Sequence, residues 1–150
     1  SIVLNEGGKE RMIRNMQTRD SQRVMQLWLN GNLQAHNFIP AKFWESNAPS
    51  VYEQLLQADG YVYEADGEIL GFAGMQGNYL AGIFVDVRSR SLEIGKKLLS
   101  HIKSRYPAFF LHVYQANRRA VAFYQREGLS IASAGTDEAT GEPDFVMTWG

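Results

Sequence analysis

Residues 61–87 limit the possible folds most, because they read as three strands joined by two short turns. Residues 61–64 and 69–73 are rich in apolar and aromatic side chains, and the pair Asp66-Gly67 between them is a strong hairpin signal. A second turn at Gly77-Asn78 leads into residues 80–87, a nearly continuous apolar run typical of a strand covered on both faces. Such strands need helices or further strands as cover, so the rest of the chain must supply those layers.

Two helices are expected before these strands, after a short strand at residues 12–16. Val24, Leu27 and Trp28 recur at helical spacing after Thr18, which can cap the first helix, and Gly31 weakens its far end. The second helix follows a break at residues 37–40. Pro40 suits its first turn, and Pro49 should kink or divide it.

The remaining elements alternate between helix and strand. Apolar residues at helical spacing from Ile94 to Ile102 predict a third helix, which Pro107 ends. A buried strand at residues 109–114 and a helix at residues 117–127 follow. Gly128 should close that helix in a left-handed conformation, and a last hairpin covers residues 129–149. This order predicts one mixed α/β domain over residues 12–150.

Residues 1–11 differ from the rest, being polar and without a period. We interpret them as a leader or an expression-derived remnant before a native start at Met12. The alternative is an extra edge strand at residues 2–4.

Composition excludes several classes of function. The net charge of -1 gives no overall field for nucleic acid or an anionic membrane, and no apolar run reaches the roughly 18 residues of a membrane span. The chain has no cysteine, which excludes disulfides, a thiol nucleophile and a cysteine-bound zinc. His36, His101 and His112 lack the spacing of metal ligands, so no metal is expected. A cytoplasmic location fits these properties.

The segment between residues 88 and 95 favours anion binding. It follows the expected central strand and opens a helix, whose first N–H groups have no partner within the helix and whose dipole is positive there. Arg88, Arg90, Lys96 and Lys97 add cations that oppose this dipole unless an anion joins them. The alternative is a solvated basic helix start. A P-loop is excluded because Lys97 stands where serine or threonine is needed.

Residues 111–129 carry the most specific pattern in the chain. Asn117, Ala120, Phe123 and Tyr124 follow a strand, and Gly128-Leu129 comes after them. The run resembles the strand, Asn-x-x-Ala-x-x-Phe-Tyr and Gly-Phe element of the GNAT superfamily of N-acetyltransferases. The resemblance implies a mixed sheet with helices on both faces, splayed open between its fourth and fifth strands, here residues 80–87 and 109–114.

The resemblance also implies the substrates and the residues that hold them. The acetyl donor would be acetyl-CoA, whose pantetheine arm pairs with the fourth strand around Ile83, Phe84 and Val85. Tyr124 would be the general acid that protonates the departing thiolate. The other residues expected to contact the cofactor are Arg90, Ser91, Leu92, Glu93, Ile94, Gly95, Lys96, Asn117, Ala120 and Phe123.

Glu93 departs from the family pattern. The phosphate-binding signature is Gln/Arg-x-x-Gly-x-Gly/Ala, in which Arg90 and Gly95 match but Glu93 replaces the middle glycine. A side chain there obstructs the approach of the backbone to the pyrophosphate, and a carboxylate repels phosphate unless it points away. Two functions therefore stay open: an N-acetyltransferase that acts by direct attack of a primary amine, and a GNAT-fold acyl-CoA-binding or regulatory module with little turnover.

No residue stands out as the general base that must take a proton from the amine. Glu64, Glu68, Asp86 and His112 lie on or beside expected strands, where a structural role is favoured. His36 is the better candidate, as a base or as an acceptor-site residue, because the segment between the first two helices usually walls the acceptor pocket in this family. The acceptor is a protein lysine or N-terminus, or a small amine such as an amino acid, polyamine or aminoglycoside. The protein itself would be a monomer or a homodimer.

Overall fold

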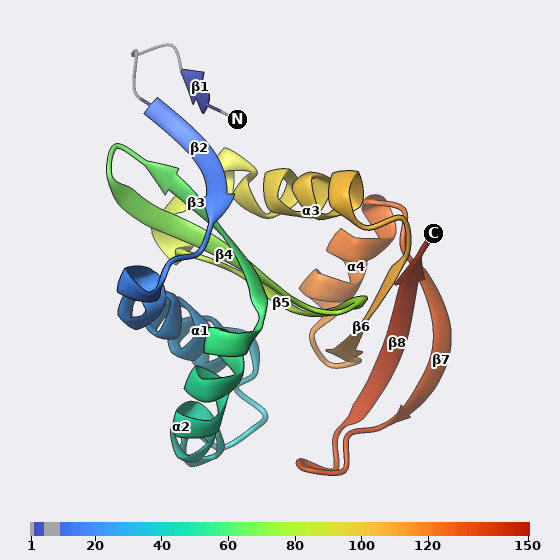
Figure 1. Ribbon diagram of the computed structural model, residues 1–150. Helices are drawn as coiled ribbons and strands as arrows, with labels where there is room; N and C mark the ends of the chain where they lie inside the picture. Colours follow the sequence, from blue (N-terminus) through green and yellow to red (C-terminus); the bar gives the residue numbers. More distant parts are fainter. Residues whose placement is uncertain (1, 5–9) are drawn as a thin grey trace.

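An eight-stranded mixed sheet forms the centre of the part of the chain that the structure describes, with the order β1-β2-β3-β4-β5-β6-β8-β7 (Figure 1). The computed structural model describes residues 2–4 and 10–150, without the side chains of residues 2–4 and 90–92. The strands are β1 (Ile2–Leu4), β2 (Glu10–Asn15), β3 (Asp59–Ala65), β4 (Glu68–Gln76), β5 (Tyr79–Val85), β6 (Phe109–Tyr114), β7 (Ser130–Thr136) and β8 (Pro143–Trp149).

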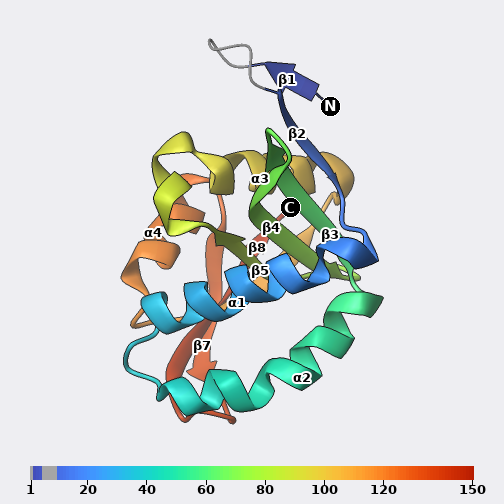
Figure 2. The ribbon, with the colours of Figure 1, turned by 90° about the vertical axis from the view of Figure 1, so that its left-hand side faces the viewer.

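Helices cover both faces of this sheet. Figure 2 shows α1 and α2 on one side, while α3 and α4 lie on the other. The helices are α1 (Ser21–Ala35), α2 (Ala41–Gln57), α3 (Ile94–Arg105) and α4 (Arg118–Arg126), with the short 3-10 helices η1 (Thr18–Asp20) and η2 (Val87–Leu92). No helix among the described residues is long and apolar enough to cross a membrane.

The sheet opens between β5 and β6, as expected. These two parallel strands share a single register pair, Tyr79 with Phe110, whereas β6 and β8 pair along six positions. Beyond Tyr79 the edge of β5 turns away from β6. The backbone from Ile83 to Val85 pairs with β4 on its other side only.

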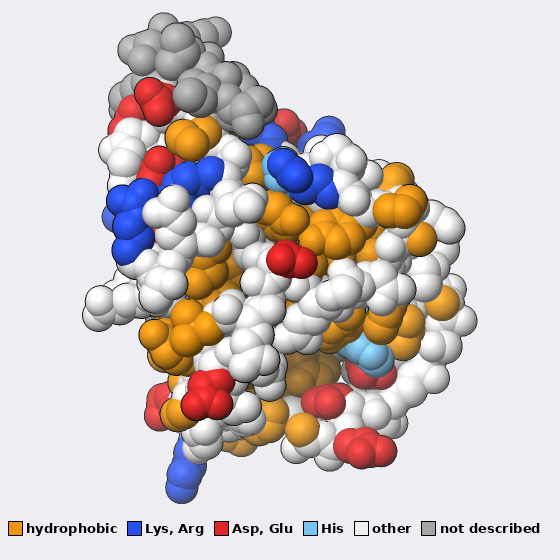
Figure 3. Space-filling view, in the orientation of Figure 1, with side chains coloured by type: hydrophobic (Ala, Val, Ile, Leu, Met, Phe, Trp, Pro, Cys, Tyr) orange, Lys and Arg blue, Asp and Glu red, His pale blue; other side chains and the backbone are white. Residues whose placement is uncertain are grey.

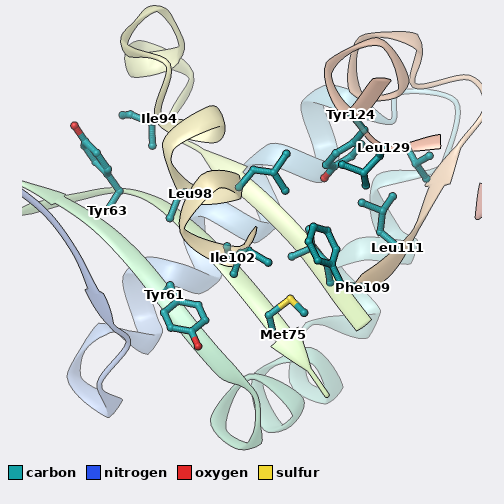
Figure 4. Packing of buried hydrophobic residues seen from close by; sticks show 14 of the residues in the cluster. Tyr61, Tyr63, Met75, Ile94, Leu98, Ile102, Phe109, Leu111, Tyr124 and Leu129 are labelled. Atoms are coloured by element: carbon teal, nitrogen blue, oxygen red, sulfur yellow. The ribbon is translucent and has the colours of Figure 1, made fainter. Parts of the chain in front are cut away.

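The hydrophobic core lies mainly between α3 and the sheet. Ile94, Leu98 and Ile102 point from one face of α3 onto the strands and are 0% exposed (Figure 4). Phe109 and Leu111 of β6 complete this layer. A second cluster packs α1 and α2 against the opposite face through Val24, Leu27, Leu55, Val62, Ile69 and Phe72.

The predicted turns are confirmed by the backbone angles. Asp66 and Gly67 have φ values of 53° and 81°, the positive values that a tight hairpin turn requires at both central positions. Gly128 follows α4 with a φ of 95°, so it closes that helix in the left-handed region.

The start of α1 differs from the prediction. Thr18 does not cap the helix, because the chain first forms η1 and α1 begins only at Ser21. Gln17 is the residue before η1, and the carboxylate of Asp20, the third residue of this turn, reaches back to accept a hydrogen bond from the Gln17 N–H at 2.8 Å. At the other end α1 continues past Gly31, which lies against β5: an added Cβ would approach Cδ1 of Phe84 to 3.0 Å.

Pro49 does not divide the second helix, which runs unbroken through α2. Proline removes the hydrogen bond to the carbonyl four residues earlier, that of Glu45. Both residues are exposed, so solvent can satisfy that carbonyl.

Residues 2–4 form the edge strand that was the alternative interpretation of this segment. Ile2–Leu4 is a strand that pairs antiparallel with β2, with Ile2 opposite Met12. Whether residues 1–11 are native stays a prediction.

Candidate active site

Two cavities meet at the opening between β5 and β6. The basic cavity has a volume of about 710 Å³ and lies between the end of α1, the free edge of β5, the start of α3 and α4. The acidic cavity has a volume of about 590 Å³ and lies between α1, α2 and the strands β5, β6 and β8. Both volumes are in the usual range for small-molecule sites. The walls of both cavities include His36, Ile83, Phe84, Asn117, Ala120 and Tyr124.

Most of the residues expected at the cofactor line the basic cavity. Val85, Glu93, Gly95, Lys96 and Phe123 belong to its wall, in addition to the six residues shared with the acidic cavity. Lys96, Arg119 and Arg126 bring positive charge, against the carboxylates of Glu93 and Glu127. The first turn of α3 adds its unpaired backbone N–H groups, so this cavity suits an anionic ligand.

Ile94 is the exception among these residues. Its side chain is 0% exposed and packs in the core under α3, so only its backbone can face a ligand. The backbone of Arg90, Ser91 and Leu92 lies in η2, and their side chains lie outside the described residues.

Residues 87–92, directly before α3, form the 3-10 helix η2. Its first arginine is already paired: Arg88 donates to both carboxylate oxygens of Asp86, at 3.1 and 2.9 Å, and to Glu68 at 3.1 Å. Of the two lysines in the first turn of α3, Lys96 faces the basic cavity, while the ammonium of Lys97 lies 5.8 Å from the ring centre of Tyr63.

Glu93 occupies the residue position between η2 and α3 in a left-handed conformation, with φ 57° and ψ 31°. Glycine adopts this region without steric cost, whereas other L-residues are strained there. The chain thus keeps at Glu93 the backbone shape that a glycine provides, while its exposed side chain stands at the rim of the basic cavity.

Tyr124 lies where the two cavities meet. It comes from α4 and is 8% exposed, packed beside Leu129 in the core (Figure 4). Burial raises the pKa of its hydroxyl, and the nearby Tyr79 raises it further. The hydroxyl therefore stays protonated at neutral pH and can act as a proton donor.

Asn117 and His36 form a polar link across the site. The Asn117 side chain caps α4 by accepting from the Ala120 N–H at 3.2 Å, and its amide nitrogen lies 3.0 Å from Nε2 of His36. Nδ1 of His36 lies 3.0 Å from Oδ1 of Asn32, whose own amide nitrogen donates to the Trp28 carbonyl. These roles place the His36 proton on Nδ1 and leave Nε2 as the acceptor from Asn117.

His36 is therefore held neutral, with both ring nitrogens engaged. Burial lowers its pKa to about 4. Its ring stacks on Trp44, with centroids 5.4 Å apart, and meets Tyr114 edge-on. These contacts favour a place in the wall of the acidic cavity over a role as a base.

Acidic side chains surround the other cavity. Asp137, Glu138 and Asp144 line it, and no lysine or arginine is found among its described wall residues. On the face seen in Figure 3, Asp and Glu side chains gather around the β7–β8 turn, while Lys and Arg lie mainly in the upper half. The negative charge suits a cationic ligand. Sequence reasoning missed these three residues because polar residues in a hairpin turn (Asp137, Glu138) or at the start of a strand (Asp144) carry no signal of their own.

The carboxylates of Asp86, Glu64 and Glu68, which were considered as bases, form ion pairs with arginines. Asp86 is 9% exposed and binds Arg88 and Arg23. The hydrogen bond from Arg88 is the main reason that the pKa of this carboxyl lies far below its usual range. Glu64 pairs with Arg14, and Glu68 pairs with Arg88. These carboxylates do not belong to the described wall of either cavity.

A sheet opened beside one buried tyrosine, with a basic cavity and an acidic cavity meeting there, is the arrangement of a protein that binds an anionic and a cationic ligand side by side.

Comparison with known proteins identifies this class. The model of the acetyltransferase (GNAT) family matches residues 26–129. Peptidyl-lysine N-acetyltransferase YiaC of Escherichia coli is 36% identical over 140 residues, which cover 92% of this chain and 96% of that protein. The solution structure of apo YjaB from Escherichia coli superposes with a TM-score of 0.81 at 20% identity, covering 93% of this chain and 97% of the other. The structure of YncA from Salmonella typhimurium with acetyl-CoA has a TM-score of 0.66 at 14% identity, covering 93% and 92%.

The chain belongs to the acetyltransferase (GNAT) family. It is an N-acetyltransferase, and the resemblance noted in residues 111–129 is confirmed.

Proposed function

We propose that the protein transfers the acetyl group of acetyl-CoA to the side-chain amine of a lysine in a protein. The single observation that carries this proposal is the meeting of the basic and acidic cavities at Tyr124. In support, a relative that is 36% identical over most of both chains is a peptidyl-lysine N-acetyltransferase, and the similar YncA fold was solved with acetyl-CoA.

The donor fits the basic cavity by charge and by backbone. Lys96, Arg119, Arg126 and the start of α3 match the phosphates of acetyl-CoA. The edge of β5 from Ile83 to Val85, which has no partner on β6, offers N–H and C=O groups to the amide-containing pantetheine arm, as in strand addition. This arrangement brings the thioester to Tyr124.

The acceptor fits the acidic cavity. A lysine ammonium is drawn to Asp137, Glu138 and Asp144 and meets the thioester at the point where the cavities join. The amine nitrogen attacks the carbonyl carbon and forms the C–N bond, and the C–S bond then breaks. Tyr124 gives its proton to the departing thiolate. The chain has no cysteine that could carry the acetyl group, which fits direct transfer.

Thiol release over a panel of amines tests this proposal. We expect the fastest release with an N-terminally blocked peptide that contains one lysine. A lysine-free peptide with a free N-terminus, a polyamine and an aminoglycoside serve as the competing acceptors. Mass spectrometry of the product locates the acetyl group. A small amine that is acetylated much faster than every lysine peptide would overturn the proposed acceptor.

Glu138→Gln is expected to raise KM for a lysine peptide by a few-fold and to leave kcat nearly unchanged. Glu138 is exposed at the mouth of the acidic cavity, where one screened charge contributes at most about 1 kcal/mol to the attraction of an ammonium. Steady-state kinetics at low salt measure the change. Glu142→Gln is the matched control, since Glu142 lies on the same turn outside the described cavity wall. An equal rise in KM for both variants would contradict a local role.

Glu93→Gly is expected to stabilise the protein by about 1 kcal/mol, because glycine relieves the left-handed strain at this position. It should also tighten acetyl-CoA binding by removing a carboxylate from the rim of the basic cavity. Thermal unfolding and titration calorimetry measure the two effects. Asp66→Gly is the control: Asp66 has a similar φ of 53° in a distant turn, so this change should leave acetyl-CoA affinity unaltered. Unchanged affinity in Glu93→Gly would show that the Glu93 side chain points away from the donor.

A further inference from the structure

The outward face of β6 brings a second histidine into the acidic cavity. Side chains alternate along this strand, so that Phe109, Leu111 and Val113 are buried in the core while His112 is exposed on the opposite face. His112 lines the acidic cavity together with Tyr124. An imidazole therefore shares one cavity with the expected general acid.

Asp144 orients this imidazole. It lies on β8 opposite Tyr114, which makes it the diagonal cross-strand neighbour of His112 on the same face of the sheet. Its Oδ2 lies 3.4 Å from Nδ1 of His112, and its side chain is 12% exposed while that of His112 is 48% exposed. At this distance the pair is a close ionic contact, and a small rotation of the half-exposed imidazole would bring its N–H onto the carboxylate. A carboxylate on Nδ1 keeps the proton there and leaves Nε2 as the acceptor.

Two described histidines line the acidic cavity, His36 and His112. Of these, His112 has a ring nitrogen without a hydrogen-bond partner among the described residues. No hydrogen bond joins its Nε2 to another described residue. His36, in contrast, has both nitrogens engaged. Asp137 already accepts from the Tyr114 hydroxyl at 3.0 Å and from Thr140 at 2.7 Å.

Tyr79 lies beside His112 in the wall of the acidic cavity. Its ring meets that of His112 edge-on, with centroids 5.8 Å apart. Burial raises the pKa of the Tyr79 hydroxyl, the carboxylates of Asp137 and Asp144 raise it further, and Tyr79 in turn raises that of Tyr124. The groups are thus within electrostatic range of one another. The titratable side chains that share the cavity with His112 are Tyr79 of β5, Tyr114 of β6, Tyr124 of α4, His36 after α1, and Asp137, Glu138 and Asp144 of β8 and the β7–β8 turn.

We propose that His112 is the general base of the reaction and that Asp144 is the residue that positions it. The inference rests on the proposed transfer to an amine. Nε2 of His112 takes one proton from the substrate ammonium, directly or through cavity water, and later releases it to solvent. The neutral amine then attacks the thioester carbon. When the C–S bond breaks, Tyr124 protonates the thiolate and recovers a proton from the nitrogen of the new amide. One acetyl group moves, one thiol forms and one proton reaches solvent.

The pH dependence of His112→Gln tests this role. General base catalysis contributes on the order of 100-fold or more, so kcat/KM near neutral pH should fall by about that factor. Without the base, only amine that is already neutral reacts, and the variant's rate should rise about tenfold per pH unit towards the ordinary lysine pKa near 10.4. The wild-type rate should rise less steeply over the same range, because the base removes the proton from the bound ammonium. His101→Gln, the same change on the far side of α3, is the control and should keep the wild-type profile.

An acceptor with a weakly basic amine distinguishes a loss of base catalysis from a general disturbance of the active-site structure. A peptide in which an aminooxy group replaces the lysine amine is already neutral at neutral pH, so His112 has no proton to take before the attack and His112→Gln should lose little activity on it. Asp144→Asn should lose about tenfold on lysine and show the same recovery. Equal losses on both acceptors, or an unchanged wild-type profile in His112→Gln, would overturn the proposal. The comparison is made on whichever amine of the panel reacts fastest, so a wrong acceptor class is detected separately by the panel itself.

Discussion

Tyr124→Phe is expected to lower kcat by about 100-fold or more and to leave the Kd of acetyl-CoA nearly unchanged. The change removes one oxygen and keeps the ring that packs against Leu129 and the core. No hydrogen bond joins this hydroxyl to another described residue, so its loss leaves no described partner unpaired. Thiol release gives kcat, and titration calorimetry gives Kd.

Tyr106→Phe is the matched control for this prediction. Burial also raises the pKa of Tyr106, but its hydroxyl lies 3.1 Å from that of Tyr61 and outside the described walls of both cavities. Its removal should leave kcat unchanged. A Tyr124→Phe enzyme with wild-type kcat would remove Tyr124 from the acid role. Because burial keeps the Tyr124 pKa above its ordinary value, the wild-type rate should show no loss from ionisation of this group near neutral pH.

Asp20→Asn is the second large effect that we expect, on stability. Asp20 is 5% exposed and accepts two hydrogen bonds from Arg14, at 2.7 and 3.1 Å. Neutralising it leaves the Arg14 guanidinium, whose side chain is 13% exposed, with Glu64 as its remaining ion-pair partner among the described residues, which should cost roughly 2–3 kcal/mol. For a chain of this length, the thermal midpoint should fall by roughly 5–10 °C.

The same variant should show a defined dependence on pH. The hydrogen bond from Arg14 is the main cause that lowers the pKa of Asp20 from its ordinary value of 3.8. A carboxyl with a lowered folded-state pKa stabilises the fold above its ordinary pKa, and this contribution is lost as the pH falls through the folded value. The difference in unfolding free energy between wild type and Asp20→Asn should therefore be full at pH 7 and shrink below about pH 4.

Glu68→Gln is the control for Asp20→Asn. It neutralises the carboxylate of another arginine pair, but Arg88 and Glu68 are 71% and 57% exposed. Such a pair contributes little in water, so the thermal midpoint should hardly move. An equal fall of the thermal midpoint in the two variants would contradict the view that burial makes the Arg14–Asp20 pair important.

Local chemistry made much of the fold predictable. The turn at Asp66-Gly67 requires positive φ at both positions, and the types of these two neighbouring residues are enough to indicate it. The same holds for Asn117 as the cap of α4 and Gly128 as its end. Alternation and helical spacing identified β6 and α3, whose buried positions recur at those periods. The apolar run from Leu80 predicted a strand covered on both faces to residue 87, but β5 ends at Val85 and Leu80 is its one buried residue, because the sheet opens beside this strand. Thr18 was assigned wrongly because a 3-10 turn before a helix has no distinct pattern.

The site was less predictable where its residues are distant in sequence. His36 and Asn117 are 81 positions apart, and their hydrogen bond decides which nitrogen of the imidazole carries the proton. Asp144 and His112 become neighbours only through the register of β6 with β8. Asp86 directly follows β5, and Arg23 reaches it from α1, 63 positions away. These pairings are set by tertiary packing, which no short sequence window contains.

The opening between β5 and β6 has a consequence for how long the enzyme survives in a cell. A sheet joined there by one register pair has a seam at which local unfolding is easiest. A donor lying in that seam binds only the folded chain, and it raises the unfolding free energy by RT ln(1 + [L]/Kd). Resistance of the protein to proteolysis should therefore rise with the acetyl-CoA concentration, in a cell as in a limited-proteolysis assay.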